Sequence, residues 1–421
     1  MNRNLADWLD YQLRTHPQAI AMGLERVREV ALRLGLGRPG KFVITVAGTN
    51  GKGSTVAFIE AIARAAGWKV GAFTSPHLQR YNERIRIDGA EVDDATLIAA
   101  FERIEDARAE IPLTYFEFGT LAALLIFEQA GLDLAILEVG LGGRLDAVNI
   151  IDADVAVITT VDIDHQEYLG TDRESIGAEK AGILRGGKPA VLGEIDPPSS
   201  VLRRAYELGA IAIRGHSDYL IERTQSGWRW REPGFELELP MPAMDASAQL
   251  DNAAAAVAAL RALPVELPMQ AFVAGVGGAQ LRGRLQKIAD EPEVVLDVGH
   301  NPQAIRQLAA WLQTHPKPTR AVFAALADKD IETMVRILEP LVGHWYLAGM
   351  KDAGPRGQDV ETLAARVATA AHAPIHRHAS VAEALSAARA ACSAGERVLV
   401  FGSFHTVAEA LDADGEAGRR V

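Results

Sequence analysis

The sequence predicts an α/β protein whose main sheet is doubly wound and mostly parallel, with a small antiparallel β part. Short runs rich in Val, Ile and Leu stop at Gly or Asp, as buried parallel strands do. Segments with apolar residues at helical spacing alternate with these runs, and such alternation is typical of a doubly wound sheet. The length of 421 residues, at about 150 residues per domain, suggests two or three domains.

In the first part of the chain, apolar β-rich runs predict strands, and periodic apolar residues predict helices. The expected elements are strands over 41–48, 133–140, 154–162 and 189–194 and helices over 54–67 and 250–263. Residues 215–245 are polar and alternate around Ser226-Gly227-Trp228. This pattern indicates antiparallel hairpins attached to the main sheet.

A smaller α/β domain is expected in the last third of the chain. The segment Ala289–Val294 carries acids and a Pro, which suits a linker. After it, strands and helices alternate again. The expected helices pass through Trp311 and cover 331–341 and 359–371. The apolar runs that alternate with them are 294–302, 320–330, 344–349 and 397–411. We therefore expect a first domain over 1–288 and a second over 289–421.

Composition narrows the function classes. The chain has 55 acidic and 43 basic residues, a formal net charge of −12, so broad binding to nucleic acid or to an anionic membrane is not expected. A single cysteine, Cys392, excludes an internal disulfide and a zinc site built from several thiolates. Its Ala-rich surroundings predict a packed thiol in a helix. Together with the absence of an apolar leader or an 18-residue apolar run, this favours a cytoplasmic protein.

The segment Val43–Ser54 is the most specific local signal, because a strand runs into a Gly-rich loop and a helix follows. The loop and the start of the helix read Gly48-Thr49-Asn50-Gly51-Lys52-Gly53-Ser54. Glycines allow a tight turn whose N–H groups converge on an anion, and a helix N-terminus adds partial positive charge. Lys52 is expected to reach the β- and γ-phosphates, and the Ser54 or Thr55 hydroxyl to face Mg²⁺. The alternative is a Gly-rich turn that only joins strand to helix.

Motifs along nearly the whole chain resemble the folate branch of the Mur-type amide ligases, which comprises folylpolyglutamate synthases and bifunctional dihydrofolate synthase/folylpolyglutamate synthases. The matching segments are 22–27, 47–55, 73–85, 113–124, 137–149, 164–170, 179–183, 251–256, 283–286, 296–302, 327–330 and 401–407. The resemblance implies an N-terminal P-loop ATPase domain and a C-terminal Rossmann-like domain, in line with the pattern above. It also implies a monomer.

The activity implied by the resemblance is ATP-dependent amide formation between a carboxylate and the amine of L-glutamate. A carboxylate is a poor acyl donor, so its phosphorylation to an acyl phosphate supplies a good leaving group before the amine attacks. The implied substrates are ATP, L-glutamate, dihydropteroate and reduced folates. The implied cofactors are two Mg²⁺ ions, a monovalent cation such as K⁺ and a CO₂-derived carbamate on Lys180.

The metal site is expected at the end of a strand. Glu138 follows the apolar run 134–137, and ligands bind at such carboxyl ends. The alternative is a capping or salt-bridged Glu. By resemblance, Ser75 and Glu138 bind Mg²⁺, and His165 completes a second site, although imidazole is an unusual Mg²⁺ ligand. Lys180 by composition is an ordinary helix lysine; the resemblance makes its carbamate a further metal ligand.

Nucleotide contacts are also carried over by resemblance. Asn252 is expected to face the adenine, Arg284 the phosphates and Asp297 the ribose. Arg284 suits a phosphate because its planar fork gives bidentate bonds. Arg282 lies two residues away, so the register between the two arginines stays open.

The second domain offers polar residues at the ends of its expected strands. They are His300, Asp328, Lys329, Asp330, Ser403 and His405. We expect His300 to be catalytic, together with Lys52 and Lys180. Asp328, Lys329, Ser403 and His405 are expected to hold L-glutamate, and helix caps or interdomain hydrogen bonds are the alternative for each.

Segments near the N-terminus and around residues 115 and 145 resemble the pteroate-binding parts of the bifunctional enzymes. The expected residues are Met22, Gly23, Leu24, Tyr115, Phe116, Glu117, Arg144, Leu145 and Asp146. Phe116 and Phe118 are candidates to stack on a flat heterocycle, with ordinary core packing as the alternative. Asp146 is a candidate acceptor for pterin N–H groups.

We therefore expect both dihydrofolate synthesis and polyglutamylation. The alternatives are a monofunctional folylpolyglutamate synthase and another Mur-type ligase acting on a UDP-sugar peptide precursor. A P-loop switch is disfavoured by Glu138, His165 and Lys180 around one phosphate site. A nucleic-acid-binding P-loop protein is disfavoured by the net charge.

Overall fold

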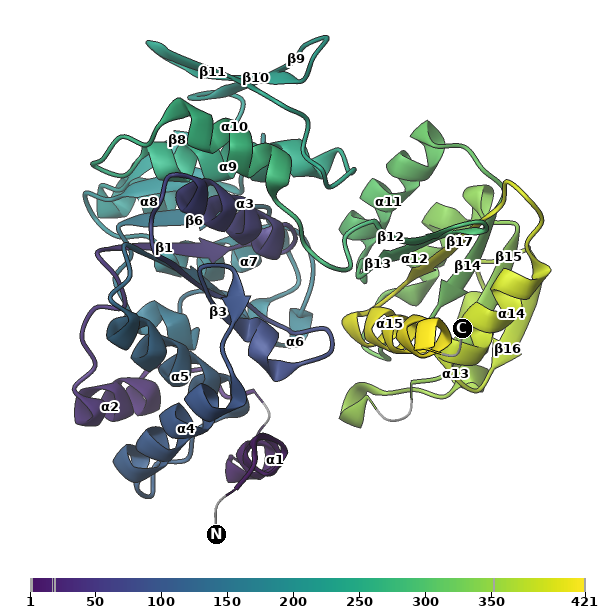
Figure 1. The fold of residues 1–421 in the computed structure, drawn as a ribbon, viewed down its shortest axis with the longest axis horizontal. Coiled ribbons are helices and arrows are strands. Elements are labelled where there is room, and N and C mark those ends of the chain that lie inside the picture. Colours follow the sequence, from purple (N-terminus) through teal and green to yellow (C-terminus); the bar gives the residue numbers. More distant parts are fainter. Residues whose placement is uncertain (1–2, 17, 19, 351–352, 420–421) are drawn as a thin grey trace. The chain divides into compact units, whose positions relative to one another are not determined.

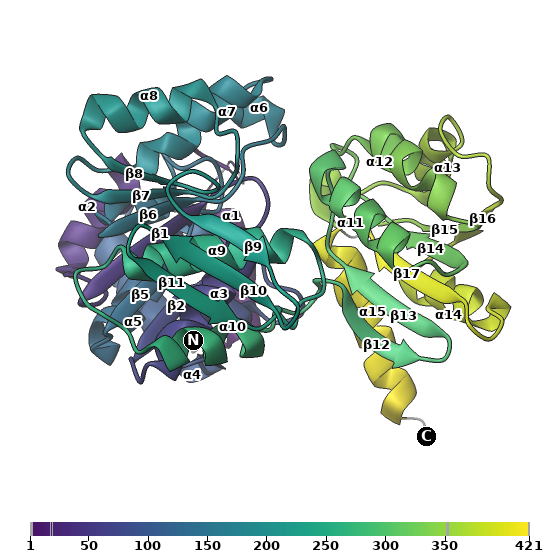
Figure 2. The same ribbon diagram turned by 90° about the horizontal axis from the view of Figure 1, so that it is seen from above.

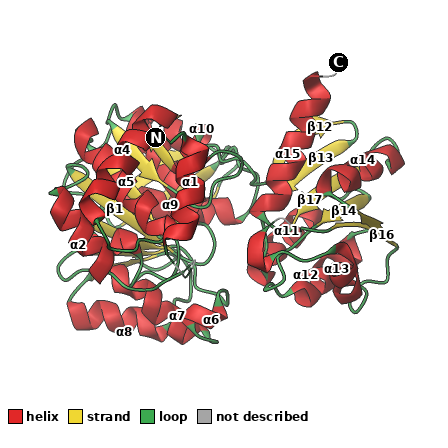
Figure 3. Cartoon of the chain, turned by 90° about the horizontal axis from the view of Figure 1, so that it is seen from below, coloured by secondary structure: helices red, strands yellow, loops and turns green. Residues whose placement is uncertain are grey.

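The computed structural model describes residues 3–16, 18, 20–350 and 353–419. The chain forms two compact units, each with its own sheet. The first unit comprises Met1–Ala243 and Gln249–Gln280, and the second comprises Met244–Ala248 and Leu281–Val421. Figure 1 shows the elements of both units, Figure 2 shows them from above, and Figure 3 marks helices, strands and loops.

The first unit is built on an eight-stranded sheet. In spatial order its strands are β4 (Ala90–Glu91), β3 (Ile85–Ile87), β2 (Val70–Phe73), β5 (Leu134–Glu138), β1 (Phe42–Ala47), β6 (Val155–Ile158), β7 (Pro189–Leu192) and β8 (Ile211–Arg214). The six strands from β2 to β8 in this order are parallel, and β3 and β4 pair antiparallel. The predicted doubly wound α/β class is confirmed.

Helices cover both faces of this sheet (Figure 1). The helices of this unit are α1 (Leu5–Thr15), α2 (Glu25–Leu34), α3 (Lys52–Ala65), α4 (Asp94–Arg108), α5 (Tyr115–Ala130), α6 (Gln166–Leu169), α7 (Arg173–Lys180), α8 (Ser199–Leu208), α9 (Ala248–Arg261) and α10 (Met269–Gly278). Val43 and Ala47 of β1 face the core that contains α1, α2, α4 and α5. Ile44 and Val46, with side chains on the opposite face, are also fully buried. Burial on both faces explains why β1 reads as a continuous apolar run.

Residues 215–245, expected to form antiparallel hairpins attached to the main sheet, contain a three-stranded sheet that is separate from the main one. The strands β9 (Leu220–Arg223), β10 (Trp228–Glu232) and β11 (Phe235–Leu239) pair antiparallel in the order β11-β10-β9. The predicted antiparallel pairing itself is correct. Trp230 is fully buried, and its indole N–H donates to the Ala254 carbonyl of α9 at 3.2 Å. The Trp230 side chain therefore anchors the small sheet to the backbone of α9.

The second unit contains a six-stranded sheet. Its spatial order is β12 (Gln286–Asp290), β13 (Glu293–Asp297), β17 (Arg397–Phe401), β14 (Thr319–Phe323), β15 (His344–Ala348) and β16 (Ile375–His378). Only β12 is antiparallel. The helices are α11 (Pro302–Thr314), α12 (Ile331–Leu338), α13 (Val360–Val367), α14 (Val381–Ala391) and α15 (Phe404–Arg419). Each predicted segment in this region contains a strand or helix, but β14 ends at Phe323, well before the end of the predicted run 320–330, and the run 397–411 divides into β17 and the start of α15.

The structure changes from the first unit to the second between Gln280 and Leu281, before the predicted boundary at 288/289. Ala289–Val294, expected as a linker, belongs to the β12–β13 hairpin. An acidic segment with a Pro suits a hairpin turn as well as a linker, so its composition alone does not separate them. Cys392 lies just past the end of α14 and is half-buried, and burial raises the pKa of its thiol.

No helix among residues 3–16, 18, 20–350 and 353–419 has the length and apolar character needed to cross a membrane.

Replacement of Trp230 tests the anchoring of the small sheet. We expect Trp230→Ala to lower the free energy of unfolding by about 3–5 kcal/mol, because it removes a fully buried ring and leaves a cavity. Chemical denaturation followed by circular dichroism measures this loss. Tyr206→Ala is the control: its side chain is 89% exposed, and its effect is expected to stay within about 0.5 kcal/mol. Equal losses in both variants would contradict the assignment.

Candidate active site

The loop Gly48–Gly51 lies between the end of β1 and the start of α3, in the order predicted from the sequence. Gly51 caps α3 with a φ of 87°, in the left-handed region. A Cβ at this position would lie 2.3 Å from Asn252 Oδ1, so glycine is required by both backbone conformation and space. The N–H groups in the first turn of a helix have no partner within the helix, so the start of α3 presents donors to an anion.

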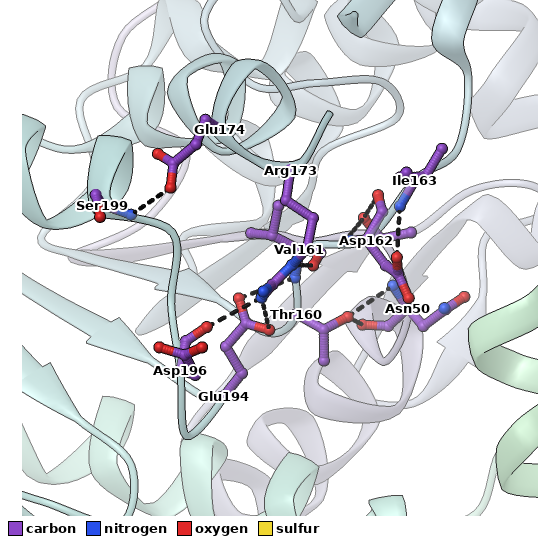
Figure 4. A network of polar contacts seen from close by, with 11 residues as sticks. Asn50, Thr160, Val161, Asp162, Ile163, Arg173, Glu174, Glu194, Asp196 and Ser199 are labelled. Atoms are coloured by element: carbon purple, nitrogen blue, oxygen red, sulfur yellow. Dashed lines mark hydrogen bonds and ion pairs between the residues drawn. The ribbon is translucent and has the colours of Figure 1, made fainter. Parts of the chain in front are cut away.

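The segment that follows β6 holds this loop in place (Figure 4). The Thr49 N–H donates to the Thr160 carbonyl at 2.8 Å, and the Asn50 N–H donates to Thr160 Oγ1 at 3.1 Å. The Asp162 N–H donates to Thr49 Oγ1 at 3.0 Å. Residues 159–162, predicted as the end of a strand, are instead this supporting loop, since β6 ends at Ile158. Thr159 still bonds to Ala47 at the end of β1, whereas Thr160 and Asp162 bond to the glycine-rich loop.

Lys52 lies over the same loop. Its Nζ donates to the carbonyls of Gly48 at 3.0 Å and Thr49 at 3.3 Å. Ser54 and Thr55, on the first turn of α3, are both buried. A lysine that folds back over the loop at the start of the helix is arranged to meet a phosphate bound there.

Two of the predicted metal ligands come together beside the loop. Glu138 ends β5 and pairs in register with Val46 of β1, while Ser75 follows the neighbouring strand β2. The Ser75 N–H donates to Glu138 Oε2 at 3.3 Å, and Glu138 is only 4% exposed. His165 follows β6 and has a φ of 52°, a left-handed conformation that is uncommon for a residue with a side chain. All three residues lie at or after the carboxyl ends of parallel strands of the same sheet.

Lys180, the last residue of α7, is buried despite its charge. Burial and, to a smaller extent, the nearby Lys52 lower the pKa of its ammonium to about 7, although Asp164, Asp146 and Glu194 oppose the shift. A lysine that is partly neutral at physiological pH is a nucleophile rather than a solvated cation. The burial of Lys180 contradicts the alternative suggested by composition alone, an ordinary helix lysine.

The three segments predicted to bind pteroate converge on the loop Gly140–Gly143. A Cβ on Gly140 would lie 2.7 Å from the Phe116 ring, and one on Gly142 would lie 3.8 Å from the Met22 methyl group. The Arg144 N–H donates to the Glu179 carbonyl at 2.8 Å, which brings the third segment against the end of α7. Segments far apart in sequence thus meet next to Lys180.

Several residues of this group have structural contacts of their own. Asp146 accepts the N–H groups of Gly140, Leu141 and Val148, and burial raises the pKa of its carboxyl group to about 6. Glu117 caps α5 through Thr114. Phe118 is fully buried in the main core, which favours the packing alternative for that ring. Phe116 is half-buried and packs 5.8 Å from Phe73.

Asn252 lies against the phosphate loop. It is buried on α9, its Nδ2 donates to Gln249 Oε1 at 3.1 Å, and its Oδ1 is the atom that would clash with a side chain at Gly51. The structure therefore brings this residue to the phosphate loop.

In the second unit, Arg284, Asp297 and His300 lie together where β13 ends. Asp297 accepts the N–H groups of Leu285 at 3.0 Å and Gly299 at 2.7 Å, and burial raises the pKa of its carboxyl group while Arg284 opposes the rise. The Arg284 guanidinium lies 5.5 Å from the Phe404 ring, and His300 is 6.3 Å from the same ring. Arg282, in contrast, is exposed. Of the two arginines left open by the sequence, this placement favours Arg284 over Arg282 as the residue that faces the phosphates.

The remaining candidates in the second unit make internal contacts. Ser403 is buried, and its Oγ accepts the Thr406 N–H at 3.0 Å, while Asp330 caps α12 by accepting the Thr333 N–H. Asp328 lies 3.9 Å from Lys329 Nζ. Burial lowers the pKa of the His405 imidazole, and Arg356 adds to this shift. Ser403 and Asp330 therefore act as helix caps, which is the alternative given for them in the sequence analysis.

Sequence reasoning passed over three residues that the structure places in this region. Arg173 and Glu194 form an ion pair beside the phosphate loop, and Arg26 donates to Glu117 Oε1 at 3.0 Å. Glu194 follows β7 closely, so the rule that ligands gather at the carboxyl ends of parallel strands would have found it. Arg26 lies within the matching segment 22–27, but nothing in the neighbouring sequence indicates that it pairs with Glu117.

Comparison with known proteins agrees with this arrangement. Two family models match: the Mur ligase middle domain over residues 46–260 and the Mur ligase, glutamate ligase domain over residues 283–404. The phosphate loop on a parallel sheet and the separate second α/β unit thus define a Mur-type ligase.

Within that class, full-length relatives are more specific. The dihydrofolate synthase/folylpolyglutamate synthase of Escherichia coli (strain K12) is 47% identical, covering 99% of this chain and 97% of the relative. That of Haemophilus influenzae is 40% identical and covers 96% of each chain. The chain belongs to the dihydrofolate synthase/folylpolyglutamate synthase family.

Solved structures give the same result. E. coli FolC in complex with DHPP and ADP matches with a TM-score of 0.94 and 46% identity, covering 100% of this chain and 99% of that chain. The bifunctional enzyme from Yersinia pestis, complexed with AMPPNP and Mn ion, matches with a TM-score of 0.91 and 46% identity over 98% of each chain.

The requirement for glycine at residue 51 can be tested by nucleotide titration. We expect Gly51→Ala to weaken ADP binding by at least about tenfold, because the new Cβ both strains the backbone and displaces Asn252. Gly67→Ala is the matched control: Gly67 has a similar φ of 83°, but a Cβ there would meet no atom within 4 Å. Unchanged binding in Gly51→Ala would show that the contact with Asn252 is dispensable.

Proposed function

We propose that this protein adds L-glutamate to dihydropteroate and to reduced folates in an ATP-dependent reaction. The observation that carries the proposal is the meeting of the phosphate loop, Glu138 and Lys180 with the pteroate-binding segments in the first unit. Relatives along the full length of the chain are dihydrofolate synthase/folylpolyglutamate synthases, which supports both substrates.

The reaction proceeds in two steps. The substrate carboxylate attacks the γ-phosphorus of ATP, the bond to ADP breaks, and an acyl phosphate forms. The amine of L-glutamate then attacks the acyl carbon, phosphate leaves, and the amine proton passes to solvent. The protein must orient three ligands and exclude water that would hydrolyse the acyl phosphate. Lys52 and the first turn of α3 hold the phosphates during the first step.

The donors around Glu138 suit Mg²⁺. This ion prefers oxygen ligands, keeps several waters, and is held by one or two carboxylates together with substrate phosphates. Glu138 and Ser75 supply a carboxylate and a hydroxyl. Among the residues that the structure describes, no three His, Cys, Asp or Glu side chains form a metal-binding cluster. When bound, Mg²⁺ neutralises phosphate charge; His165 and modified Lys180 would hold the second ion.

Lys180 is proposed to carry a carbamate. The neutral amine attacks the carbon of CO₂, a C–N bond forms, and the departing proton leaves an anionic carbamate. The burial of Lys180 and its pKa of about 7 support this step, because the neutral amine is the reactive form. The conversion also removes a cation from beside Lys52.

The other roles follow the predicted residues. Asn252, Arg284 and Asp297 are proposed to bind the nucleotide, and His300 to act in catalysis with Lys52 and Lys180. Met22–Leu24, Tyr115–Glu117 and Arg144–Asp146 are proposed to bind pteroate. L-glutamate is proposed to bind to Asp328, Lys329, Ser403 and His405. The support is weakest for Ser403, because its hydroxyl already accepts the Thr406 N–H.

We further propose that the protein is a monomer in the cytoplasm and has no nucleic-acid or membrane partner. We also propose that it uses a monovalent cation such as K⁺. The solved structure of a bifunctional folylpolyglutamate synthase/dihydrofolate synthase with Mn, AMPPNP and L-glutamate bound supports a divalent metal, a nucleotide and glutamate. Activity in K⁺ against Na⁺ buffers tests the monovalent cation.

A phosphate-release assay tests the two activities. Purified protein with ATP and L-glutamate is expected to release phosphate with dihydropteroate and, separately, with tetrahydrofolate, and mass spectrometry should find one added glutamate in each product. Omission of L-glutamate should abolish the release. Activity with tetrahydrofolate but none with dihydropteroate would leave only the monofunctional alternative, and activity with UDP-sugar peptide precursors would favour another Mur-type ligase.

The carbamate on Lys180 predicts a dependence on CO₂ and pH. With ¹³C-labelled bicarbonate, the carbamate carbon signal should grow from about pH 6 to about pH 8, because the neutral amine increases as pH rises through the pKa. We expect Lys180→Ala to lose this signal and about 100-fold of the ligase activity.

Lys188→Ala is the control for both measurements, since Lys188 is a half-exposed lysine that pairs with Asp154. An unmodified Lys180 amine in fully active protein would refute the carbamate.

A further inference from the structure

Arg173 and Glu194 form an ion pair to which the roles above assign nothing. Arg173 is the first residue of α7, and Glu194 follows the end of β7. Arg173 Nη2 and Glu194 Oε2 lie 3.1 Å apart, and the Glu194 side chain is only 15% exposed. The Arg173 side chain is 41% exposed. A mostly buried carboxylate such as that of Glu194 is costly unless further hydrogen bonds satisfy its oxygens.

Those further hydrogen bonds are concentrated on the backbone of a single residue, Val161 (Figure 4). Arg173 Nε donates to the Val161 carbonyl at 2.8 Å, and the Val161 N–H donates to Glu194 Oε1 at 3.1 Å. Arg173 Nη2 also donates to the Asp196 carbonyl at 3.0 Å. The pair therefore holds both polar backbone groups of Val161 and connects the start of α7 to the loop after β7.

Val161 lies between Thr160 and Asp162, which both support the phosphate loop. Thr160 accepts the N–H groups of Thr49 and Asn50, and Asp162 exchanges hydrogen bonds with Thr49 Oγ1. A continuous path of hydrogen bonds thus runs from the ion pair through residues 160–162 to the loop. Displacement of Val161 would displace the loop's own anchors.

We propose that Arg173 and Glu194 are positioning residues of the nucleotide site, which fix Thr160–Asp162 and thereby the loop Gly48–Gly51. The inference rests on the proposed function, because it assumes that the loop Gly48–Gly51 binds the nucleotide. A backbone cradle binds phosphate tightly only when its N–H groups are already oriented, so a looser support lowers affinity without removing any contact to the ligand.

Two other roles give different results. If Arg173 attracted the nucleotide through its charge alone, Arg173→Lys would preserve binding, and Glu194→Gln would tighten it by removing a negative charge. As positioning residues, both variants should bind more weakly: lysine lacks the fork that reaches Val161, Glu194 and Asp196, and glutamine loses the charge-assisted bonds to Arg173.

If the pair only stabilised the fold, both variants would lose thermal stability and leave binding unchanged. Burial raises the pKa of the Glu194 carboxyl group to about 7, against the opposing effect of Arg173. The fold therefore gains little from the charge of this carboxylate, and a neutral amide of the same shape should leave the melting temperature nearly unchanged.

The experiment measures the dissociation constant of ADP with Mg²⁺ by calorimetry, together with the melting temperature of the unliganded protein. We expect Arg173→Lys and Glu194→Gln each to raise the dissociation constant about tenfold, as loss of a supporting contact commonly does. In the ligase assay, KM for ATP should rise similarly, while KM for L-glutamate stays within about twofold. The double variant should lose no more than the single variants, since both act through Val161.

Glu105→Gln is the matched control, because Glu105 and Arg108 form another partly buried ion pair at 2.6 Å in the same unit, within α4. It should leave the dissociation constant of ADP unchanged. The inference would be overturned if both variants bound ADP within about twofold of the unmodified protein, or if Glu194→Gln bound it more tightly. Unfolding of both variants would also overturn it. If the unmodified protein itself failed to bind ADP, the proposed function rather than the positioning role would be refuted.

Discussion

The first unit depends on hydrogen bonds between two loops at the carboxyl edge of its sheet. The loop after β1 would have no fixed shape by itself, and Thr160 and Asp162, which follow β6, bond to Thr49 and Asn50 and hold it. The contact is possible because β1 and β6 are neighbours and parallel, so both end at the same edge. Ser75, Glu138 and Glu194 follow other strands that end there, which explains how one edge gathers residues from far along the chain.

Electrostatics at this edge oppose the charge of the whole molecule. The net charge is −12, yet the proposed substrates are anions, so the positive field must be local. Lys52 supplies part of it. A charged Lys180 would add to it, but the burial of Lys180 and the repulsion from Lys52 both lower the pKa of Lys180. A carbamate on Lys180 would relieve the repulsion and provide an oxygen ligand for a metal. The same burial that disfavours a charged lysine therefore favours its modification.

The second unit shows why strand-end residues are ambiguous in a sequence. His300, Asp330 and Ser403 all follow strands or begin helices, where ligands and helix caps are equally expected. In the structure, Asp330 and Ser403 satisfy N–H groups of the helices that they precede, whereas His300 lies near Phe404 together with Arg284 and Asp297. Only the direction of each side chain separates the two roles.

The sequence by itself determined the fold class, the strand–loop–helix around Gly48–Lys52, and the family, because periodicity, glycine positions and motif order are local properties. It did not determine that 215–245 form a separate sheet, that Ala289–Val294 lie in a hairpin, or that Thr159–Asp162 leave the strand. Those outcomes depend on partners distant in sequence: Ala254 for Trp230, β13 for β12, and Thr49 for Asp162. The tertiary structure alone decided that Arg173 and Glu194 meet at Val161, since hydrogen bonds between three separate segments leave no periodic or compositional signal.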